Sequence, residues 1–407
     1  MPDKEQRPFG QLIPYEEALS TVLKNVHPVK RKESVDLDDA FQRVLAEDVT
    51  SDIFVPPFER AAMDGFAVKA EDTFDAGKFD PVTLEQTGTL HAGDAPDEEV
   101  GNGECIQIAT GAPLPEGADA VVKVEETEKK DGQIAIYDPV HPGENVSPKG
   151  EDIEEGERIL DKDMSLTSAR IGSLAAIGVQ KVKVYEKPKI GVIPTGDEVV
   201  PVGDELEPGQ IYDVNSHTLS SVVRNNGCEP VNKKVVQDSI EGLKKEIENE
   251  VEEMDMVLFS GGSSVGDKDI LIDALDSMGE VIFHGVKLKP GKPTLFGKVK
   301  DTLVIGMPGY PTSCLNTAQR LIKPALRKMS RLPKSVERTT KAKLQKRITS
   351  SLGRQQYMTV KLDEDKAMPV YKQSGAITSM SRADGYFEIP ENVELVEKGE
   401  EINVTLY

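Results

Sequence analysis

The segment DMVLFSGGSSVGDKDILIDALDSMG (255–279) joins an apolar run to an amphipathic stretch and decides the fold of the chain around it. The run at 256–259 predicts a buried strand, and the apolar positions of 270–278 recur at helical spacing before Gly279. Between them, the Gly/Ser-rich loop 260–269 places backbone N–H groups at the start of a helix, which favours an anion. A tight turn without a ligand is the alternative. The loop has neither a Walker A lysine nor GxGxxG, which disfavours ordinary NTPases and dinucleotide-binding enzymes.

The same alternation of strands and helices continues on both sides of this segment. The run KIGVIP (189–194) predicts another buried strand, and PTLFGKVKDTLVIGMP (293–308) predicts a β-hairpin. A long helix is expected from Pro311 to about Ser330, with a kink at Pro324 because proline cannot donate a backbone hydrogen bond. Such an alternation is typical of a mostly parallel sheet covered by helices. The remaining expected elements are helices at 214–227, 238–254 and 268–279 and a strand at 231–236.

The spacing of apolar and turn-forming residues divides the rest of the chain into three further parts. Apolar spacing predicts helices at 14–26, 38–46 and 165–178, and short apolar runs between Gly, Pro and Asp clusters indicate a β-rich module inserted between the last two. Short β-like runs return after Pro333. The expected fold is a multidomain α/β protein, with a mostly parallel α/β domain, a mixed N-terminal domain that carries an inserted β-rich domain, and a small β-barrel-like C-terminal domain. The expected boundaries are 1–52 plus 152–185 (N-terminal), 53–151 (inserted), 186–332 (α/β) and 333–407 (C-terminal).

Composition excludes several classes of function. The 407-residue chain has 71 acidic and 49 basic side chains, which give a formal net charge of −22. This charge repels nucleic acid and anionic membranes, so neither is expected as a partner. No apolar run approaches the about 20 residues that span a bilayer, and we expect a cytoplasmic protein. The cysteines and histidines are scattered, which disfavours a disulfide framework, a zinc site and a Ser-His or Cys-His nucleophile.

A basic turn stands out in this acidic sequence. Lys287, Lys289 and Lys292 lie within VKLKPGKP (286–293). In an extended segment Lys287 and Lys289 share one face, and the prolines around Gly291 indicate that the ammonium groups are held in place, as anion binding requires. A solvated basic turn is the alternative.

Polar side chains follow the expected strands of the α/β domain. The motif TGDE (195–198) comes directly after KIGVIP, and the loop 260–269 follows the next apolar strand. Ligands of open α/β sheets gather at the carboxyl ends of the strands. Carboxylates beside a phosphate-binding loop and lysines are what a Mg²⁺-bridged phosphate site needs. Helix capping is the alternative role for Asp213, Asn215, Ser216, Asp238, Asp267 and Asp269.

Three further segments are rich in turn-forming residues. The segment MPGYPTS (307–313) ends the expected hairpin and opens the long helix, whose N-terminal dipole favours an anion. A helix that simply begins with proline is the alternative. The segments AMDGFA (62–67) and TGAPLP (110–115) lie inside the β-rich module, where their composition indicates loops.

The ordered motifs AAMDGFA, TGAPLPEGADAVV, KGEDI, TGDE, YDVNS, SGGSSVGDKD, KLKPGKP and MPGYPTS resemble those of the molybdopterin molybdenumtransferase family, which includes the E domain of gephyrin. The resemblance covers nearly the whole chain. It implies a transferase that inserts molybdate into adenylylated molybdopterin and releases AMP, the final step of molybdenum cofactor biosynthesis. It also implies Mg²⁺ as cofactor, a homodimer of four-domain subunits, and clefts shared between the α/β domain of one subunit and the inserted domain of the other.

The resemblance also implies roles for individual residues. Arg354 and Ser374 correspond to further anion-contacting positions in the C-terminal domain, and Asp64, Thr110 and Asp152 approach from the partner subunit. The expected catalytic residues are Asp64, Asp197, Glu198, Asp238, Asp269, Lys289 and Lys292. The expected substrate-binding residues are Thr110, Asp152, Thr195, Asn215, Ser216, Gly261, Gly262, Ser263, Ser264, Pro308, Gly309, Pro311, Ser313, Arg354 and Ser374, and Mg²⁺ is expected at Asp267 and Asp269.

Two positions depart from the family pattern, and three other functions stay open. Tyr310 stands where many members have Asn, and Phe66 where Tyr is common. The first alternative is a molybdopterin adenylyltransferase, although that activity needs only the α/β domain. The second is a non-catalytic gephyrin-like scaffold, and the third is a generic sugar-phosphate or nucleotide binder. Expected protein partners are molybdopterin adenylyltransferase and the enzymes that accept the finished cofactor.

Overall fold

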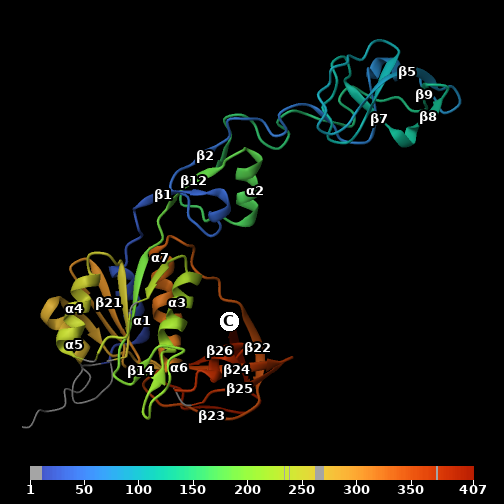
Figure 1. Ribbon diagram of the computed structural model, residues 1–407. Coiled ribbons are helices and arrows are strands. Elements are labelled where there is room, and N and C mark those ends of the chain that lie inside the picture. Colours follow the sequence, from blue (N-terminus) through green and yellow to red (C-terminus); the bar gives the residue numbers. More distant parts are fainter. Residues whose placement is uncertain (1–11, 233, 238, 262–269, 373–374) are drawn as a thin grey trace, which may run out of the picture. The chain divides into compact units, whose positions relative to one another are not determined.

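The computed structural model describes residues 12–232, 234–237, 239–261, 270–372 and 375–407, which form two compact units (Figure 1). The first unit contains the chain up to 33, residues 42–44 and residues 184–407. The second contains 34–41 and 45–183 and is inserted into the first along the sequence. No helix in the described part of the chain is long and apolar enough to span a membrane.

A six-stranded sheet forms the centre of the first unit. Its order is β16-β13-β17-β21-β20-β18, and its first four strands are parallel, whereas β20 and β18 run antiparallel to their neighbours. This confirms the mostly parallel α/β domain and the expected hairpin. The bounds are β13 (Lys189–Pro194), β16 (Glu229–Asn232), β17 (Met256–Ser260), β18 (Glu280–His284), β20 (Leu295–Val299) and β21 (Thr302–Met307).

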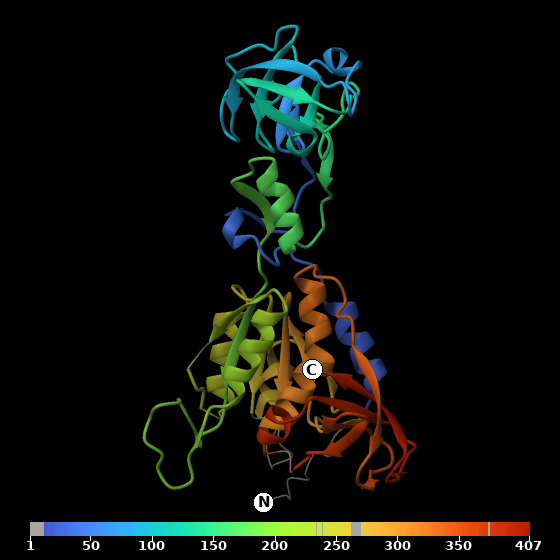
Figure 2. The same cartoon turned by 90° about the vertical axis from the view of Figure 1, so that its right-hand side faces the viewer.

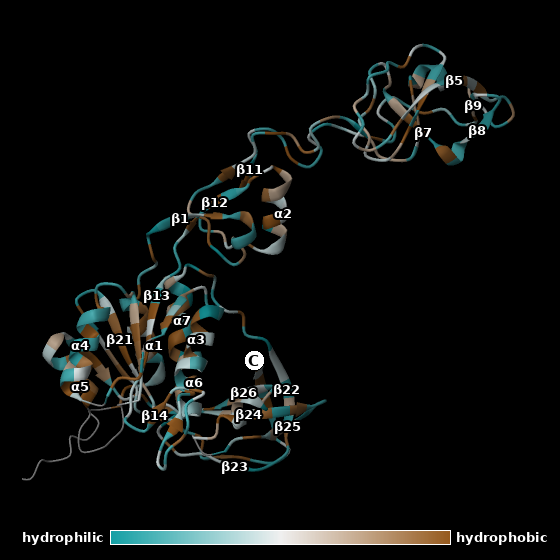
Figure 3. Ribbon diagram, in the orientation of Figure 1, coloured by the Kyte–Doolittle hydropathy of each residue, from teal (hydrophilic) through white to brown (hydrophobic). Residues whose placement is uncertain are grey.

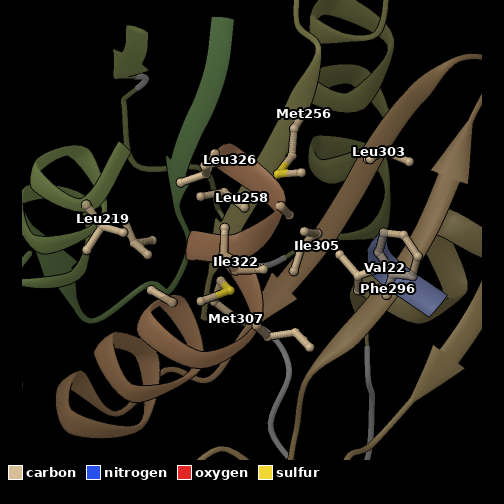
Figure 4. Packing of buried hydrophobic residues seen from close by; sticks show 14 of the residues in the cluster. Val22, Leu219, Met256, Leu258, Phe296, Leu303, Ile305, Met307, Ile322 and Leu326 are labelled. Atoms are coloured by element: carbon tan, nitrogen blue, oxygen red, sulfur yellow. The ribbon is translucent and has the colours of Figure 1, made fainter. Parts of the chain in front are cut away.

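Helices cover both faces of this sheet. One face packs against α1, α3, α6 and α7, and the other packs against α4 and α5. Figure 3 shows the strands as hydrophobic along most of their length, as expected for strands that are buried on both faces. In Figure 4, Leu258 and Ile305 of the sheet face Ile322 and Leu326. The helices are α1 (Tyr15–Asn25), α3 (Asn215–Asn225), α4 (Ile240–Glu250), α5 (Ile270–Met278), α6 (Pro311–Thr317) and α7 (Lys323–Met329).

The expected long helix is interrupted just before Pro324. A π-helical segment, Ala318–Ile322, separates α6 from α7. Pro324 has no N–H to donate to the carbonyl of Arg320, and that carbonyl accepts a hydrogen bond from the Tyr15 hydroxyl at 3.0 Å. The proline therefore frees an acceptor that ties α1 to this helix. Helices α1 and α7 lie side by side in Figure 2. A second hydrogen bond, from Lys328 Nζ to the carbonyl of Leu23, also joins them.

The C-terminal sheet has the order β19-β24-β25-β22-β28-β26, and an additional pairing joins β24 to β26. One of its strands, β19 (Leu288–Lys289), belongs to the basic turn of the α/β domain and pairs in parallel with β24. Arg320 of the π segment also joins the two parts, because its guanidinium carbon lies 3.4 Å from the ring centroid of Tyr386. The other bounds are β22 (Thr339–Leu344), β23 (Ile348–Thr349), β24 (Gln355–Asp363), β25 (Lys366–Pro369), α8 (Thr378–Ser381), β26 (Gly385–Ile389), β27 (Leu395–Val396) and β28 (Glu401–Leu406).

The second unit contains a six-stranded sheet of order β7-β4-β6-β5-β9-β8, with apolar clusters on both of its faces. Helix α2 (Ser168–Ala176) begins at Thr167, whose hydroxyl accepts from the N–H of Arg170, and is followed by Gly178 in a left-handed conformation. The strands are β2 (Val49–Thr50), β3 (Arg60–Ala61), β4 (Gly65–Val68), β5 (Val82–Leu90), β6 (Glu104–Ile108), β7 (Ala120–Lys123), β8 (Thr127–Lys130), β9 (Gln133–Ile136), β10 (Val146–Ser147) and β11 (Arg158–Leu160). Strands β1 (Lys32–Asp36) and β12 (Lys181–Tyr185) flank the insertion, and β14 (Val199–Val200) and β15 (Ile211–Tyr212) lie in the first unit.

The expected helix at 38–46 is wrong. Only a short 3-10 turn, Leu37–Asp39, forms there, and Gln42 has a positive φ of 61°. The N–H groups of Leu45 and Ala46 donate to the carbonyls of Met164 and Lys183 instead of to a preceding helical turn. Pairing with distant segments therefore overrides the local helical pattern.

We expect Gly65→Ala to destabilise the second unit. An added Cβ would lie 1.9 Å from the carbonyl oxygen of Val122, so the pairing of β4 with β7 must open. The expected cost is about 1–3 kcal/mol, measured as a lower Tm of the full chain. Gly172→Ala is the matched control, because its Cβ meets nothing within 4 Å in helix α2 and should stabilise by about 0.5–1 kcal/mol. Equal Tm changes in the two variants would contradict this account.

Candidate ligand site at the carboxyl ends of the strands

The register of the α/β sheet brings three loops to one edge. Pro194, Ser260 and Met307 are the last residues of β13, β17 and β21 and lie opposite one another in neighbouring parallel strands. The motifs TGDE and PGYP therefore emerge beside Gly261. Strand β16, which follows β13 in the sequence, lies on one side of β13, and β17, the next strand, lies on its other side. The strand order therefore reverses at β13. Open α/β sheets bind their ligands at this reversal.

Glycine lets the backbones of these loops approach closely. Gly261 has a φ of +122°, and a Cβ there would lie 2.3 Å from the carbonyl oxygen of Thr195. A Cβ on Gly309 would lie 3.7 Å from the Cα of Gly261, which places the third loop beside the second. The three strand ends thus form one continuous backbone surface.

The start of α3 is tied to the same edge. The Asn215 side-chain amide donates to the carbonyl of Gly309 at 2.8 Å. Asp213 accepts hydrogen bonds from the N–H and the hydroxyl of Ser216, so its carboxylate has the capping role that was the alternative to metal binding. Asp197 and Glu198 are exposed at the end of β13. The expected residues Thr195, Asn215, Ser216, Gly261, Pro308, Gly309 and Pro311 are brought together here, and Ser313 is buried in the first turns of α6.

Several polar atoms at this edge are buried without a partner. Thr195 Oγ1, Ser260 Oγ and Asn215 Oδ1 find no hydrogen-bond partner among the described residues, although the exposure of these three side chains is only 2%, 3% and 8%. A buried unsatisfied polar group costs about 1–3 kcal/mol and needs an explanation. A polar ligand bound at the strand ends would provide these missing partners.

Lysine and arginine meet beside this edge. Asn316 of α6 donates to the carbonyl of Pro290 at 2.7 Å, which fixes the basic turn against the helix that follows β21. Pairing of β19 with β24 then brings Lys289 close to Arg354. Burial lowers the pKa of Lys289, and the positive charge of Arg354 lowers it further. Two cations are therefore held near each other at the edge of the α/β domain.

The three lysines of the basic turn have different surroundings. The ammonium of Lys287 lies 3.8 Å from a carboxylate oxygen of Glu391, whereas Lys289 Nζ donates to the Ser351 hydroxyl at 2.9 Å. Within the described residues, neither Lys289 nor Arg354 has a carboxylate within ion-pair distance. The carbonyl of Lys292 accepts from the N–H of Val286, so Lys292 belongs to the same tight turn. The sequence therefore identified the basic turn but not the different environments of its lysines.

Part of the expected site lies outside the described residues. These positions are Asp238, Gly262, Ser263, Ser264, Asp267, Asp269 and Ser374. Across the part of the chain that the structure describes, no three His, Cys, Asp or Glu side chains are grouped so that they could hold a metal ion. The two expected Mg²⁺ ligands, Asp267 and Asp269, are among the positions just named.

Two of the expected partner-facing residues contact each other in the second unit. Asp64 accepts hydrogen bonds from the backbone N–H of Thr110 at 2.7 Å and from its hydroxyl at 2.8 Å. These bonds lower the pKa of Asp64 because they stabilise the ionised form. Asp152 is exposed, and its N–H donates to the carbonyl of Val55. The motifs AMDGF and TGAP thus lie side by side, and together they present the Asp64 carboxylate on the surface of the second unit.

The surroundings of the Ser260 and Ser351 hydroxyls were not anticipated by the motif analysis. Ser260 ends an apolar strand, and its unsatisfied hydroxyl could have been suspected only once the sheet was known to be buried on both faces. Ser351 lies 62 positions beyond Lys289, and no local pattern marks it. Only the pairing of β19 with β24 brings the two side chains together.

The fold and the converging loops place this chain among the open α/β proteins, which bind their ligands at the reversal of strand order. Three family models match the chain in order: the "MoeA N-terminal region (domain I and II)" at 13–178, the "Probable molybdopterin binding domain" at 191–328, and the "MoeA C-terminal region (domain IV)" at 341–407. The chain belongs to the MoeA family of transferases in molybdenum cofactor biosynthesis.

Named relatives and solved structures agree with this assignment. The molybdopterin molybdenumtransferase of Bacillus subtilis is 31% identical, with 97% of this chain and 94% of the relative covered. The molybdopterin molybdenumtransferase of Haemophilus influenzae is 35% identical, with 78% of each chain covered. A crystal structure of the molybdopterin biosynthesis MoeA protein of Pyrococcus horikoshii is 43% identical, covers 97% of this chain and 99% of that one, and gives a TM-score of 0.83.

We expect Thr110→Val to raise the pKa of Asp64 towards its ordinary value. The variant loses the hydroxyl that stabilises the carboxylate but keeps the backbone N–H, so part of the lowering should persist. Carboxyl-detected NMR titration measures the change. Thr89→Val, an exposed threonine on β5, should leave the pKa of Asp64 unchanged. An unaltered titration of Asp64 in Thr110→Val would show that the hydroxyl does not contribute.

Proposed function

We propose that this chain inserts molybdate into adenylylated molybdopterin and releases AMP. The observation that carries the proposal is the pair Lys289 and Arg354, two neighbouring cations with no ion-pair partner among the described residues, beside the carboxyl ends of the strands. Like charges held together at one place are unfavourable unless an anion lies between them. Carboxylates that could neutralise these two cations are abundant in a chain with a net charge of −22, yet none of the described ones forms an ion pair with Lys289 or Arg354.

The reaction requires such a concentration of positive charge. Molybdate is a dianion, and the adenylylated pterin carries negative phosphates. Two dianions about 5 Å apart repel by on the order of 10 kcal/mol at an effective dielectric constant of about 20. Lys289, Lys292 and Arg354 would neutralise the incoming oxoanion, and the backbone of the strand-end loops would hold the phosphates. Preorganised charge of this kind accelerates a reaction because it is in place before the reacting groups arrive.

No protein nucleophile is needed in this scheme. The residues hold the two anions close together. The metal of molybdate bonds to the two dithiolene sulfurs while one of its oxygens leaves with the two thiol protons as water. A water molecule hydrolyses the bond between the two phosphates of the adenylylated pterin, so that AMP leaves. The unsatisfied polar atoms of Thr195, Ser260 and Asn215 would contact the pterin substrate at the reversal of strand order. Mg²⁺ at Asp267 and Asp269, with Asp197, Glu198 and Asp238 nearby, stays a prediction from the family resemblance, and no step is assigned to it.

We further propose a homodimer in which Asp64, Thr110 and Asp152 face the strand-end site of the neighbouring subunit. Support comes from the contact between Asp64 and Thr110, whose two hydrogen bonds hold these side chains together on an exposed surface of the second unit. A cytoplasmic location and the expected protein partners also stay predictions. Sedimentation of the full chain would test the homodimer directly.

The molybdopterin adenylyltransferase alternative is less well supported. Arg354 and the partner of Lys289 come from the segment between β23 and β24, which an isolated α/β domain lacks. A scaffold without catalysis would not need two neighbouring cations without ion-pair partners, although peptide titration can test it independently. A generic sugar-phosphate binder would not depend on the pterin dithiolene, so a substrate without the thiols distinguishes it.

Lys289→Ala should lower molybdate-dependent AMP release from adenylylated molybdopterin by about 100-fold or more, as removal of a preorganised charge does. The assay measures AMP and the active cofactor with Mg²⁺ and micromolar molybdate present. The matched control is Lys361→Ala, which removes the same charge from an exposed position on β24 and should retain full activity. Unimpaired AMP release by Lys289→Ala would refute the assigned role.

A further inference from the structure

The environment of the Lys289 ammonium is unusual for a lysine in an acidic protein. Its ammonium donates a hydrogen bond to the neutral hydroxyl of Ser351 at 2.9 Å, and the charged side chain that lowers its pKa, in addition to burial, is another cation, Arg354. Lys287, two positions earlier, is instead close to the carboxylate of Glu391. Lys287 therefore has a carboxylate beside it, whereas no carboxylate among the described residues lies within ion-pair distance of Lys289, whose charge can act on a ligand.

The loop that carries Ser351 is fixed at both ends. On one side, β23 pairs with β27, and the N–H of Ser350 donates to the carbonyl of Glu394 at 2.7 Å. On the other side, the N–H of Gly353 donates to the carbonyl of Glu391 at 2.7 Å. The Ser350 hydroxyl also contacts the buried amide of Gln356, the residue that pairs with Lys289 across the two strands. The hydroxyl of Ser351 is therefore presented to Lys289 by an anchored loop.

We propose that Ser351 is a positioning residue that holds the Lys289 ammonium in the orientation that binds the oxoanion substrate. This inference rests on the proposed function and deepens it. A free lysine side chain has four rotatable bonds and must lose that freedom when it binds an anion. Contact with Ser351 fixes the ammonium in advance, so less of this cost falls on the binding step.

The chemistry of the contact also selects the ligand. Because the Ser351 oxygen accepts a hydrogen bond from Lys289, its own O–H must point elsewhere and is available as a donor. Ser351, Lys289 and Arg354 then each offer a donor, which suits a tetrahedral oxoanion whose oxygens only accept. A pterin ring, which also carries donors, fits this cluster less well. The cluster should therefore determine affinity for molybdate and leave affinity for the adenylylated pterin almost unchanged.

The test compares Ser351→Ala with Ser351→Thr in the full-length chain. In Ser351→Ala we expect molybdate affinity, measured by isothermal titration with molybdate alone, to fall by about tenfold, as loss of one hydrogen bond to a charged group does. The KM for molybdate should rise by a similar factor, with kcat and the KM for the adenylylated pterin nearly unchanged. Ser351→Thr keeps the hydroxyl and should restore most of the affinity.

Ser277→Ala is the matched control, because that hydroxyl donates to the carbonyl of Ala274 within helix α5. It should bind molybdate as the unaltered chain does. If the unaltered chain releases AMP with molybdate and Ser351→Ala matches it in affinity and KM, the positioning role is wrong but the proposed function stands. If the unaltered chain itself gives no molybdate-dependent AMP release, the proposed function fails. A loss in Ser351→Ala that Ser351→Thr does not restore would also overturn the role of the hydroxyl.

Discussion

The parallel pairing of β19 with β24 is the interaction on which the site depends. It is only two residues long, and a pairing so short is weak in isolation. Three further contacts stabilise this pairing. Leu288 and Gln356 are buried, and the Asn316 side chain donates a hydrogen bond to the carbonyl of Pro290. Through this pairing a strand of the C-terminal sheet is formed by the α/β domain, so the two parts share one site. Without it, Lys289 and Arg354 would belong to separate surfaces.

The register of the α/β sheet supplies the second constraint. Parallel strands buried on both faces must align their apolar residues, and this alignment sets Pro194, Ser260 and Met307 side by side. The loops that follow these strands therefore lie next to one another, and Gly261 and Gly309 allow their backbones to come close. The buried polar atoms of Thr195, Ser260 and Asn215 that lack a hydrogen-bond partner among the described residues destabilise the fold, and a bound polar ligand would remove this penalty. A site at this position thus follows from the packing of the sheet.

The basic side chains of the described residues differ in whether a carboxylate lies beside them. Surface lysines and arginines such as Arg31, Lys183 and Lys341 form ion pairs with carboxylates, which are abundant in a chain with a net charge of −22. Among the described residues no carboxylate forms an ion pair with Lys289 or Arg354, and burial together with the nearby charge of Arg354 lowers the pKa of the lysine. An oxoanion bound between them would reverse that shift, because it stabilises both positive charges. Substrate binding and lysine protonation therefore favour each other.

The sequence by itself determined the elements whose pattern is local. The apolar run of β13, the strand and helix on either side of loop 260–269, and the loops that follow the strands were predictable because burial on both faces leaves a continuous apolar signature. Only the tertiary structure decided the rest. Segment 38–46 does not form the expected helix because distant segments accept the hydrogen bonds of Leu45 and Ala46. Ser351 contacts Lys289 across 62 positions because a two-residue strand of the α/β domain pairs with the C-terminal sheet. Contacts of this kind depend on where the chain returns in space, and no local spacing of residues records that.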